Sequence, residues 1–375
     1  MAEYILYDVQ VRLLTPLHIG SGRELLHKYD YAIHGGRTWR LDEGAILAMQ
    51  ETDDPAWTAR LTRIPPADLL REEDFRADAP YFRYLVRGVP RSAAEGIQVR
   101  EQLKDPYDRP YLPGSSLKGA LRTALAWHGW KVLNLRPDKG RLKPNPRFAA
   151  QDYERRIFGK NPNHDLLRAL QVGDSEPVGA DRLILVNARV LHRSGATASP
   201  IELEALAPNT VLPLRIKLDE ALFSAWARRR GLTLRGREWL EQLLQIVRQH
   251  TAQRLADEVA WFTGVPGAER VADFYRRLSQ TGLPAHAFLI QVGWGTGWDD
   301  KTFGSHLRAD ERFMEGILAP RRRGGYGLAR GRLRRGDPFP KSRRVLVRVR
   351  RGPGGQVHEE PAAPLGWLLV EMRPR

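Results

Sequence analysis

The 375-residue sequence contains no cysteine, which excludes disulfide frameworks, cysteine-based zinc sites, iron–sulfur clusters and thiol catalysis. It also lacks any run of about 18 apolar residues, the length that a membrane-spanning helix requires. After Met1 the chain passes directly into a strand-like alternation, without the charged and apolar regions of a signal peptide. From these absences we expect a cytosolic, soluble protein with no membrane partner.

Lysine is scarce although the chain is strongly basic. Arginine supplies 50 of the 60 basic residues, which face 44 acidic residues and leave a net charge of +16. Because arginine suits sites where a planar group binds phosphate or stacks on a base, this bias indicates a polyanionic partner. Residues 301–375 alone hold 18 basic and 7 acidic residues. With 42% apolar residues the chain can bury a core, and its length suggests two domains of about 150 residues or more.

The order of the expected elements predicts an α+β protein built from two units, residues 1–165 and 166–375. Residues 4–14 alternate as a half-buried strand does and run into a glycine-punctuated loop. Poor periodicity over 53–109 predicts an irregular insertion, and residues 134–145 are expected to form a mobile basic loop. The remaining patterns predict hairpins over 29–41 and over 201–206 with 211–218, helices over 42–50, 220–229 and 236–262, and strands over 183–191, 288–292, 345–349 and 367–371.

The clearest local pattern predicts an amphipathic helix within residues 111–130. Its apolar positions recur with helical spacing at Leu117, Ala120, Leu121, Ala124 and Leu125. Either of two serines, Ser115 or Ser116, is placed to cap the first turn. On the opposite face Lys118 and Arg122 lie one turn apart, beside backbone N–H groups that favour an anion, so an RNA phosphate could bind there. An ordinary solvated face is the alternative for such a pair.

Two glycine-rich segments carry the second candidate for nucleic-acid contact, residues 293–304 and 321–336. Glycine lets a backbone approach a ligand closely, and neighbouring arginine supplies charge for a phosphate backbone. Neither segment has the spacing of a P-loop or of the dinucleotide-binding fingerprint. A solvated basic turn is the alternative, but an aromatic ring among the arginines favours RNA. The RNA-binding candidates here are Lys301, Arg321, Arg322, Arg323, Gly324, Gly325, Tyr326, Gly327 and Arg330.

Catalytic and metal-binding patterns are weak. His18 follows the first strand, where a loop residue could act as a general base or contact RNA, but no partner for it is evident in the sequence. No metal-ligand spacing occurs, so no metal and no cofactor are predicted. Asp299 and Asp300 are interpreted as a helix cap, Asp174 as a turn or cap, and Trp294 as a core residue.

Five segments together resemble the RAMP superfamily of CRISPR proteins. Their order is similar to that in the fifth Csm subunit of type III-A effector complexes. Residues 113–122, with the sequence PGSSLKGALR, are the most specific of the five, whereas nothing in residues 53–91 matches. The five segments are LTPLHIGSG (14–22), YLPGSSLKGALRTAL (111–125), VGWGTGWDDKT (292–302), GGYGLARG (324–331), and FPKSRR (339–344) followed by PLGWLLVEM (364–372).

The resemblance implies two ferredoxin-like (RRM-like) domains with insertions, and a subunit that caps the 3′ end of the guide RNA (crRNA). Its partners are then the crRNA, the other Csm subunits, above all the repeating backbone subunit, and host nucleases that mature the guide for antiviral defence. It also implies a role without catalysis, since target cleavage in the family belongs to an aspartate of the backbone subunit. Two rivals stay open. One is a RAMP endoribonuclease that processes precursor crRNA with His18 as base and Lys118 or Arg122 as phosphate ligand, and the other is a scaffold independent of RNA.

Overall fold

The computed structural model describes residues 4–50, 55–61, 63–321, 324–328, 339–352 and 356–375. Within them the chain is α+β, as the pattern predicts. The strands are β1 (Tyr4–Leu13), β2 (Gly20–Leu26), β3 (Tyr31–His34), β4 (Arg37–Leu41), β5 (Phe82–Arg87), β6 (Gln98–Gln102), β7 (Leu170–Val172), β8 (Leu183–His192), β9 (Thr197–Leu206), β10 (Val211–Asp219), β11 (Ala287–Gln291), β12 (Ser342–Arg351), β13 (Val357–Ala363) and β14 (Trp367–Pro374). The helices are α1 (Glu43–Ala48), α2 (Pro55–Leu61), α3 (Gly114–Val132), α4 (Gln151–Phe158), α5 (Ala225–Arg229), α6 (Arg237–Glu241), α7 (Leu243–Phe262), α8 (Glu269–Ser279), α9 (Gly304–Leu307) and α10 (Glu311–Leu318).

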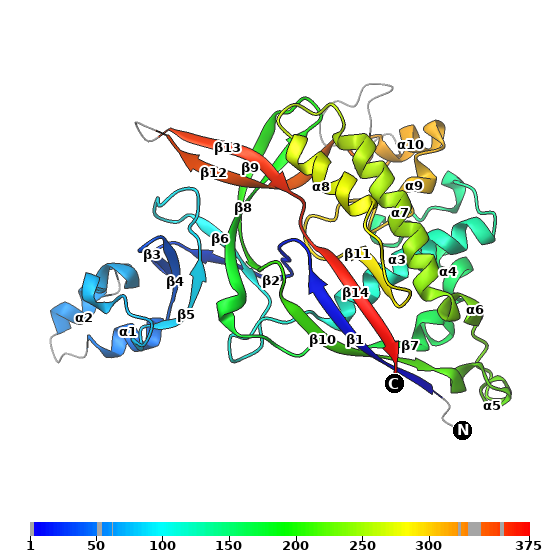
Figure 1. Cartoon of the computed structure of the whole chain (residues 1–375), viewed down its shortest axis with the longest axis horizontal. Helices are drawn as coiled ribbons and strands as arrows, with labels where there is room; N and C mark the ends of the chain where they lie inside the picture. The colour runs from blue at the N-terminus through cyan, green and yellow to red at the C-terminus, as the bar shows by residue number, and fades with distance from the viewer. Residues whose placement is uncertain (1–3, 51–54, 62, 322–323, 329–338, 353–355) are drawn as a thin grey trace.

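The first sheet has five strands in the order β11-β14-β1-β10-β7, and each neighbouring pair is antiparallel. β1 lies at its centre, so the first and last strands of the chain run side by side (Figure 1). Val9, Val11 and Leu13 are fully buried on one face of β1, which confirms the strand that the alternation predicts.

The second sheet curls around the middle of the molecule in the order β2-β6-β9-β8-β5-β4-β3. β12 and β13 form a two-stranded ribbon that joins this sheet through β12. The first half of β8 pairs briefly with β5, and its second half pairs with β12. In Figure 1, β3, β4 and β5 form a lobe with α1 and α2, on the side of the molecule away from α3 and α7. The segment expected to be irregular therefore contributes two strands, β5 and β6, to this sheet, and that expectation was wrong for them.

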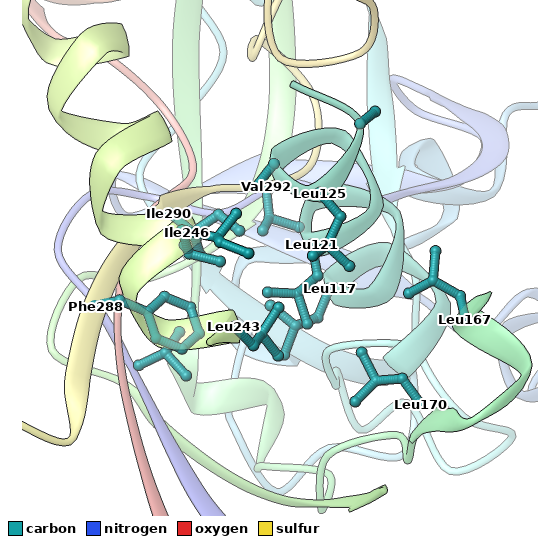
Figure 2. Packing of buried hydrophobic residues seen from close by; sticks show 14 of the residues in the cluster. Leu117, Leu121, Leu125, Leu167, Leu170, Leu243, Ile246, Phe288, Ile290 and Val292 are labelled. Atoms are coloured by element: carbon teal, nitrogen blue, oxygen red, sulfur yellow. The ribbon is translucent and has the colours of Figure 1, made fainter. Parts of the chain in front are cut away.

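Helix α3 and helix α7 pack together against the first sheet. Leu117, Leu121 and Leu125 are fully buried on one side of α3, as predicted. Figure 2 shows them facing Ile246 of α7 and Ile290 of β11. This apolar layer fixes the position of α3 on the sheet. It therefore also fixes the direction in which the polar face of α3 points.

One predicted hairpin is wrong. Strands β9 and β10 follow one another across residues 207–210, yet they belong to different sheets. The segment after β1 takes the hydrogen bonds that such a hairpin would make. Leu17 exchanges two backbone hydrogen bonds with Leu206, at 3.1 and 2.9 Å, and Leu13 donates to the Thr210 carbonyl at 3.0 Å. β9 instead forms a hairpin with β8.

Strands from both sides of the predicted boundary at residues 165 and 166 pair within each sheet. β1 pairs with β10 and β14 in the first sheet, and β6 pairs with β9 in the second. The two predicted domains thus share their sheets, and their ferredoxin-like character stays a prediction. The long helix expected over 236–262 is divided at Gln242 into α6 and α7, and the one expected over 220–229 consists of a 3-10 turn followed by α5.

Candidate nucleic-acid interface

A groove of about 560 Å³ lies between the first half of α3 and two loops, one that runs from β1 into β2 and a glycine-rich one after β11. We call it the α3 groove. It brings together three of the sequence motifs that lie far apart in the chain. Its lining includes Gly20 from the start of β2, Ser115, Ser116 and Arg122 from α3, and Trp294 and Lys301 from the loop after β11.

The loop after β1 and the loop after β11 are in direct backbone contact. Trp294 donates its backbone N–H to the His18 carbonyl at 2.9 Å. Gly293 has a φ of +86°, and a Cβ at this position would lie 2.6 Å from the same carbonyl oxygen. Only glycine avoids both the backbone strain and the clash. The glycine in this motif therefore permits a close contact between two loops.

His18 is a buried residue that orients the loop after β1. Its side chain is 1% exposed, and Nδ1 lies 2.6 Å from the Glu204 carbonyl oxygen. Burial lowers the pKa of His18 to about 4, so the imidazole is neutral at pH 7. The Glu204 carboxylate below it accepts hydrogen bonds from Lys104 at 2.6 Å and from Tyr84 at 2.9 Å. A side chain so enclosed has no open face for a substrate.

The start of α3 is capped from outside the helix, and the expectation that a serine caps it was wrong. Pro113 is the N-cap residue and makes no side-chain hydrogen bond. Asp174 accepts from the Gly114 N–H at 2.7 Å instead, which agrees with its interpretation as a cap. Ser115 and Ser116 are left at the wall of the α3 groove, where their hydroxyls can donate to a ligand.

The two basic residues of α3 differ. Arg122 lies 2.8 Å from Asp165 and 3.2 Å from Glu154, and its guanidinium stacks over the Phe158 ring at 3.8 Å. Its charge is thus already paired with carboxylates, and its contact with an RNA phosphate stays a prediction. Lys118 is half-buried, and burial is the main reason that its pKa is lowered. It lines a second hollow of about 470 Å³, which shares Arg122 and Glu154 with the α3 groove.

The acidic pair before Lys301 is part of a buried ion network, and its interpretation as a helix cap was wrong. Arg254 of α7 lies 3.2 Å from Asp300, 3.6 Å from Asp299 and 2.7 Å from Glu258. Arg343 of β12 reaches Glu258 at 2.8 Å. Glu258 lies one turn from Arg254 on α7, but Asp299, Asp300 and Arg343 are distant in the sequence, so no local pattern indicates the rest of the network. The network holds the loop after β11 against α7 and leaves Lys301 exposed at the groove.

The described residues of the second arginine-rich loop do not line the α3 groove. Tyr326 is half-buried and donates its hydroxyl to the Lys143 carbonyl at 2.6 Å. A Cβ on Gly325 would lie 2.1 Å from the Ala319 carbonyl oxygen, so this glycine serves a close backbone contact. Gly324, Gly327 and Arg321 are exposed beside them, whereas Arg322, Arg323 and Arg330 lie outside the described residues.

Sequence reasoning missed the place of Trp294. It was interpreted as core because its spacing from Trp298 matches one helical turn, but it is only half-buried and lines the α3 groove. The segment from Trp294 to Trp298 is not helical, so a spacing of four residues does not place the two rings on one face. The glycines on both sides of it were the available signal, because they favour a loop.

Two kinds of site are absent from the described part of the chain. No helix within it is long and apolar enough to span a membrane. Nor do three or more His, Asp or Glu side chains gather there in a way that could hold a metal ion.

The curled sheets, the helix packed on them and the glycine loops at its start define a RAMP protein. The chain belongs to the RAMP superfamily, whose family model matches residues 10–298. It is similar to the CRISPR system Cms protein Csm5 of Streptococcus thermophilus, with 29% identity over 247 residues that cover 58% of this chain and 66% of the relative. The protein of the same name from Mycobacterium tuberculosis is 24% identical over 79% of this chain and 83% of the relative.

Solved structures agree with this assignment. A chain of a cryo-EM Csm–crRNA–target RNA ternary complex from a type III-A CRISPR-Cas system matches with a TM-score of 0.69 and 22% identity, covering 98% of this chain and 100% of that chain. The crystal structure of T. onnurineus Csm5 matches with a TM-score of 0.59 and 21% identity over 96% and 99% of the two chains. At these identities the likeness shows a shared fold. The predicted resemblance to the fifth Csm subunit is confirmed.

Proposed function

We propose that this chain is a Csm5-type subunit of a type III-A CRISPR effector complex and binds the guide RNA there without catalysing a reaction. It caps the complex at the 3′ end of the crRNA, next to the repeating backbone subunit, and host nucleases that mature the guide act beside it in the cytoplasm. The names of its relatives and the RNA complex that holds a chain of the same fold support this assignment.

The α3 groove is the observation that carries the RNA-binding part of the proposal. It gathers two serine hydroxyls, the exposed ammonium of Lys301 and the half-buried ring of Trp294 along one surface. Hydroxyls and basic groups bind phosphate and sugar, and an aromatic ring offers a stacking surface to a base. A single RNA strand presents all three of these partners at once, and the net charge of +16 favours its approach.

The endoribonuclease rival requires His18 at the surface. In the structure its ring is enclosed and neutral, and the guanidinium of Arg122 is paired with carboxylates. Incubation of the purified protein with repeat RNA, without metal, separates the two readings. We expect no product. Product that disappears in His18→Ala, while that variant melts like the wild type, would establish the rival.

Removal of one charge at the groove tests the RNA-binding proposal. Lys301→Ala should weaken the binding of single-stranded RNA and reduce the dependence of log affinity on log salt by about 0.7, the value for one phosphate contact with a single strand. Lys131→Ala is the matched control, because this exposed lysine lies in the last turn of α3, away from the groove. Binding that is insensitive to salt would favour the RNA-independent scaffold.

A further inference from the structure

Two arginines share one face of the second sheet although they lie on strands that do not touch. Arg100 of β6 is paired with Leu203 of β9, and Leu203 is paired with Val186 of β8. Paired residues have side chains on the same face of a sheet. Arg100 and Val186 therefore lie on one face.

The same face continues to β12. Ala188, two residues after Val186, is paired with Leu346. Arg344 lies two residues before Leu346 on β12, and alternate residues of a strand share a face. Leu203, Val186, Ala188 and Leu346 form one apolar cluster, which confirms that their side chains meet. Arg100 and Arg344 thus border this cluster from opposite ends.

Trp294 packs on this apolar cluster and is contacted by both arginines. The guanidinium carbon of Arg344 lies 5.1 Å from the centroid of the indole ring, and that of Arg100 lies 5.8 Å from it. Both distances are within the range of a cation–π contact. One aromatic ring therefore holds two guanidinium groups at one place, and the same ring lines the α3 groove.

These two cations are poorly neutralised. Arg100 has one carboxylate nearby, Glu24 at 3.7 Å, and both side chains are more than 40% exposed. Within the described residues no carboxylate lies within 4 Å of Arg344, whereas its half-buried neighbour Arg343 is paired with Glu258. Burial and the charge of Arg100 lower the pKa of Arg344, and Arg344 in turn contributes to the lowered pKa of Lys301.

We propose that Arg100 and Arg344 form a clamp on Trp294 that binds one phosphate of the RNA strand as it leaves the α3 groove. The clamp rests on the proposed function, because it extends the same binding surface by one nucleotide. A guanidinium presents its N–H groups as a fork that fits phosphate oxygens, and two forks on one ring can meet the same phosphate. The like charges that crowd here are relieved when an anion binds.

Single and double variants of the full-length chain test the clamp with oligouridine as the probe. Arg100→Ala and Arg344→Ala should each weaken binding by about tenfold, as expected for a lost hydrogen bond to a charged group. The salt dependence of log affinity reflects the number of phosphates that are neutralised, and both arginines bind one phosphate. The double variant should therefore reduce this dependence by about 0.7, rather than by the roughly 1.4 expected for two separate phosphates. Arg348→Ala is the matched control, since this residue is exposed on the same strand, β12.

The outcomes separate the clamp from the proposed function. If the clamp variants bind as the wild type does while Lys301→Ala is weakened, the clamp is wrong and RNA binding in the groove stands. If Lys301→Ala is unaffected as well, the proposed groove function fails. Double variants that bind oligouridine normally but no longer join sibling subunits would show that the arginines meet an acidic protein segment, which also overturns the clamp. Arg344→Gln, whose side chain can still cover the indole, repeats the test if Arg344→Ala unfolds early.

Discussion

The two glycine-rich loops of this chain are both predicted from the sequence to contact RNA, but they differ in the structure. In the loop over residues 293–302, Asp299 and Asp300 form buried ion pairs with Arg254, and these pairs anchor the loop. The same loop lines the α3 groove. The described part of the loop over 321–328 is anchored by Tyr326 to the backbone of Lys143 and lines no part of that groove. Both loops are rich in glycine, but the contacts that anchor each loop decide which one faces a ligand-sized hollow.

The largest effect should come from removal of the first anchor. Arg254→Ala leaves Asp300 without its buried counterion and removes one of the counterions of Asp299 and of Glu258, and breaking such a buried pair typically costs about 3–5 kcal/mol. Urea unfolding should show this loss in the free energy of unfolding. Arg312→Ala, at an exposed site, is the control and should stay within about 0.5 kcal/mol of the wild type. Equal stability of the two variants would refute the anchor.

The next effect concerns the helix that faces the first loop. Leu121 is fully buried, so Leu121→Ala should lower the free energy of unfolding by about 2–5 kcal/mol. Leu328 in the second loop is 43% exposed, and Leu328→Ala should change the stability little. Thermal melts should therefore show a lower melting temperature for Leu121→Ala and nearly the wild-type melting temperature for Leu328→Ala.

Asp300 gives the first anchor a pH dependence. Burial raises the pKa of Asp300 to about 6, and one of its oxygens has no hydrogen-bond partner among the described residues. The folded state therefore binds this proton more tightly than the unfolded state, whose aspartate titrates near about 4. Between these values the stability of the wild type relative to Asp300→Asn should fall as the pH rises. Denaturant titrations at several pH values measure this difference, and a rise would contradict the raised pKa.

The smallest effect is expected in the second loop. Tyr326→Phe removes the hydroxyl that bonds to the Lys143 carbonyl and should cost about 1 kcal/mol or less. Hydrogen exchange of the backbone around residues 324–328 should accelerate, while residues 293–302 should remain as protected as before. Tyr29→Phe, at a position that is 45% exposed, provides the control. Faster exchange in both loops would show that the two anchors are coupled.

The sequence was informative where a pattern is local. The alternation in β1 and the apolar face of α3 predict the elements and the buried side chains correctly, because each follows from spacing along one element. The motifs also select Ser115, Ser116 and Lys301, which the structure gathers at one groove.

What the sequence could not show depends on contacts between distant segments. Asp174 caps α3 from 60 residues away, so a nearby serine was the natural but wrong choice. Residues 13–17 form backbone hydrogen bonds with the end of β9 and with the turn before β10, in place of a β9–β10 hairpin. Nothing in the sequence of that turn indicates these contacts. Asp165, which pairs with Arg122, and Asp300, which pairs with Arg254, likewise come from other segments of the chain. Local periodicity carries no information on such partners.

Cross-linking of the guide RNA within the assembled complex tests the difference between the two loops most directly. Thiouridine in the RNA strand would be photoactivated, and the cross-linked peptides identified by mass spectrometry. The structure predicts cross-links to the peptides that carry Ser115, Trp294 and Lys301, with none to the peptide that carries Tyr326. Cross-links confined to residues 321–328, with the walls of the α3 groove unlabelled, would contradict the assignment of the groove as the RNA-binding surface.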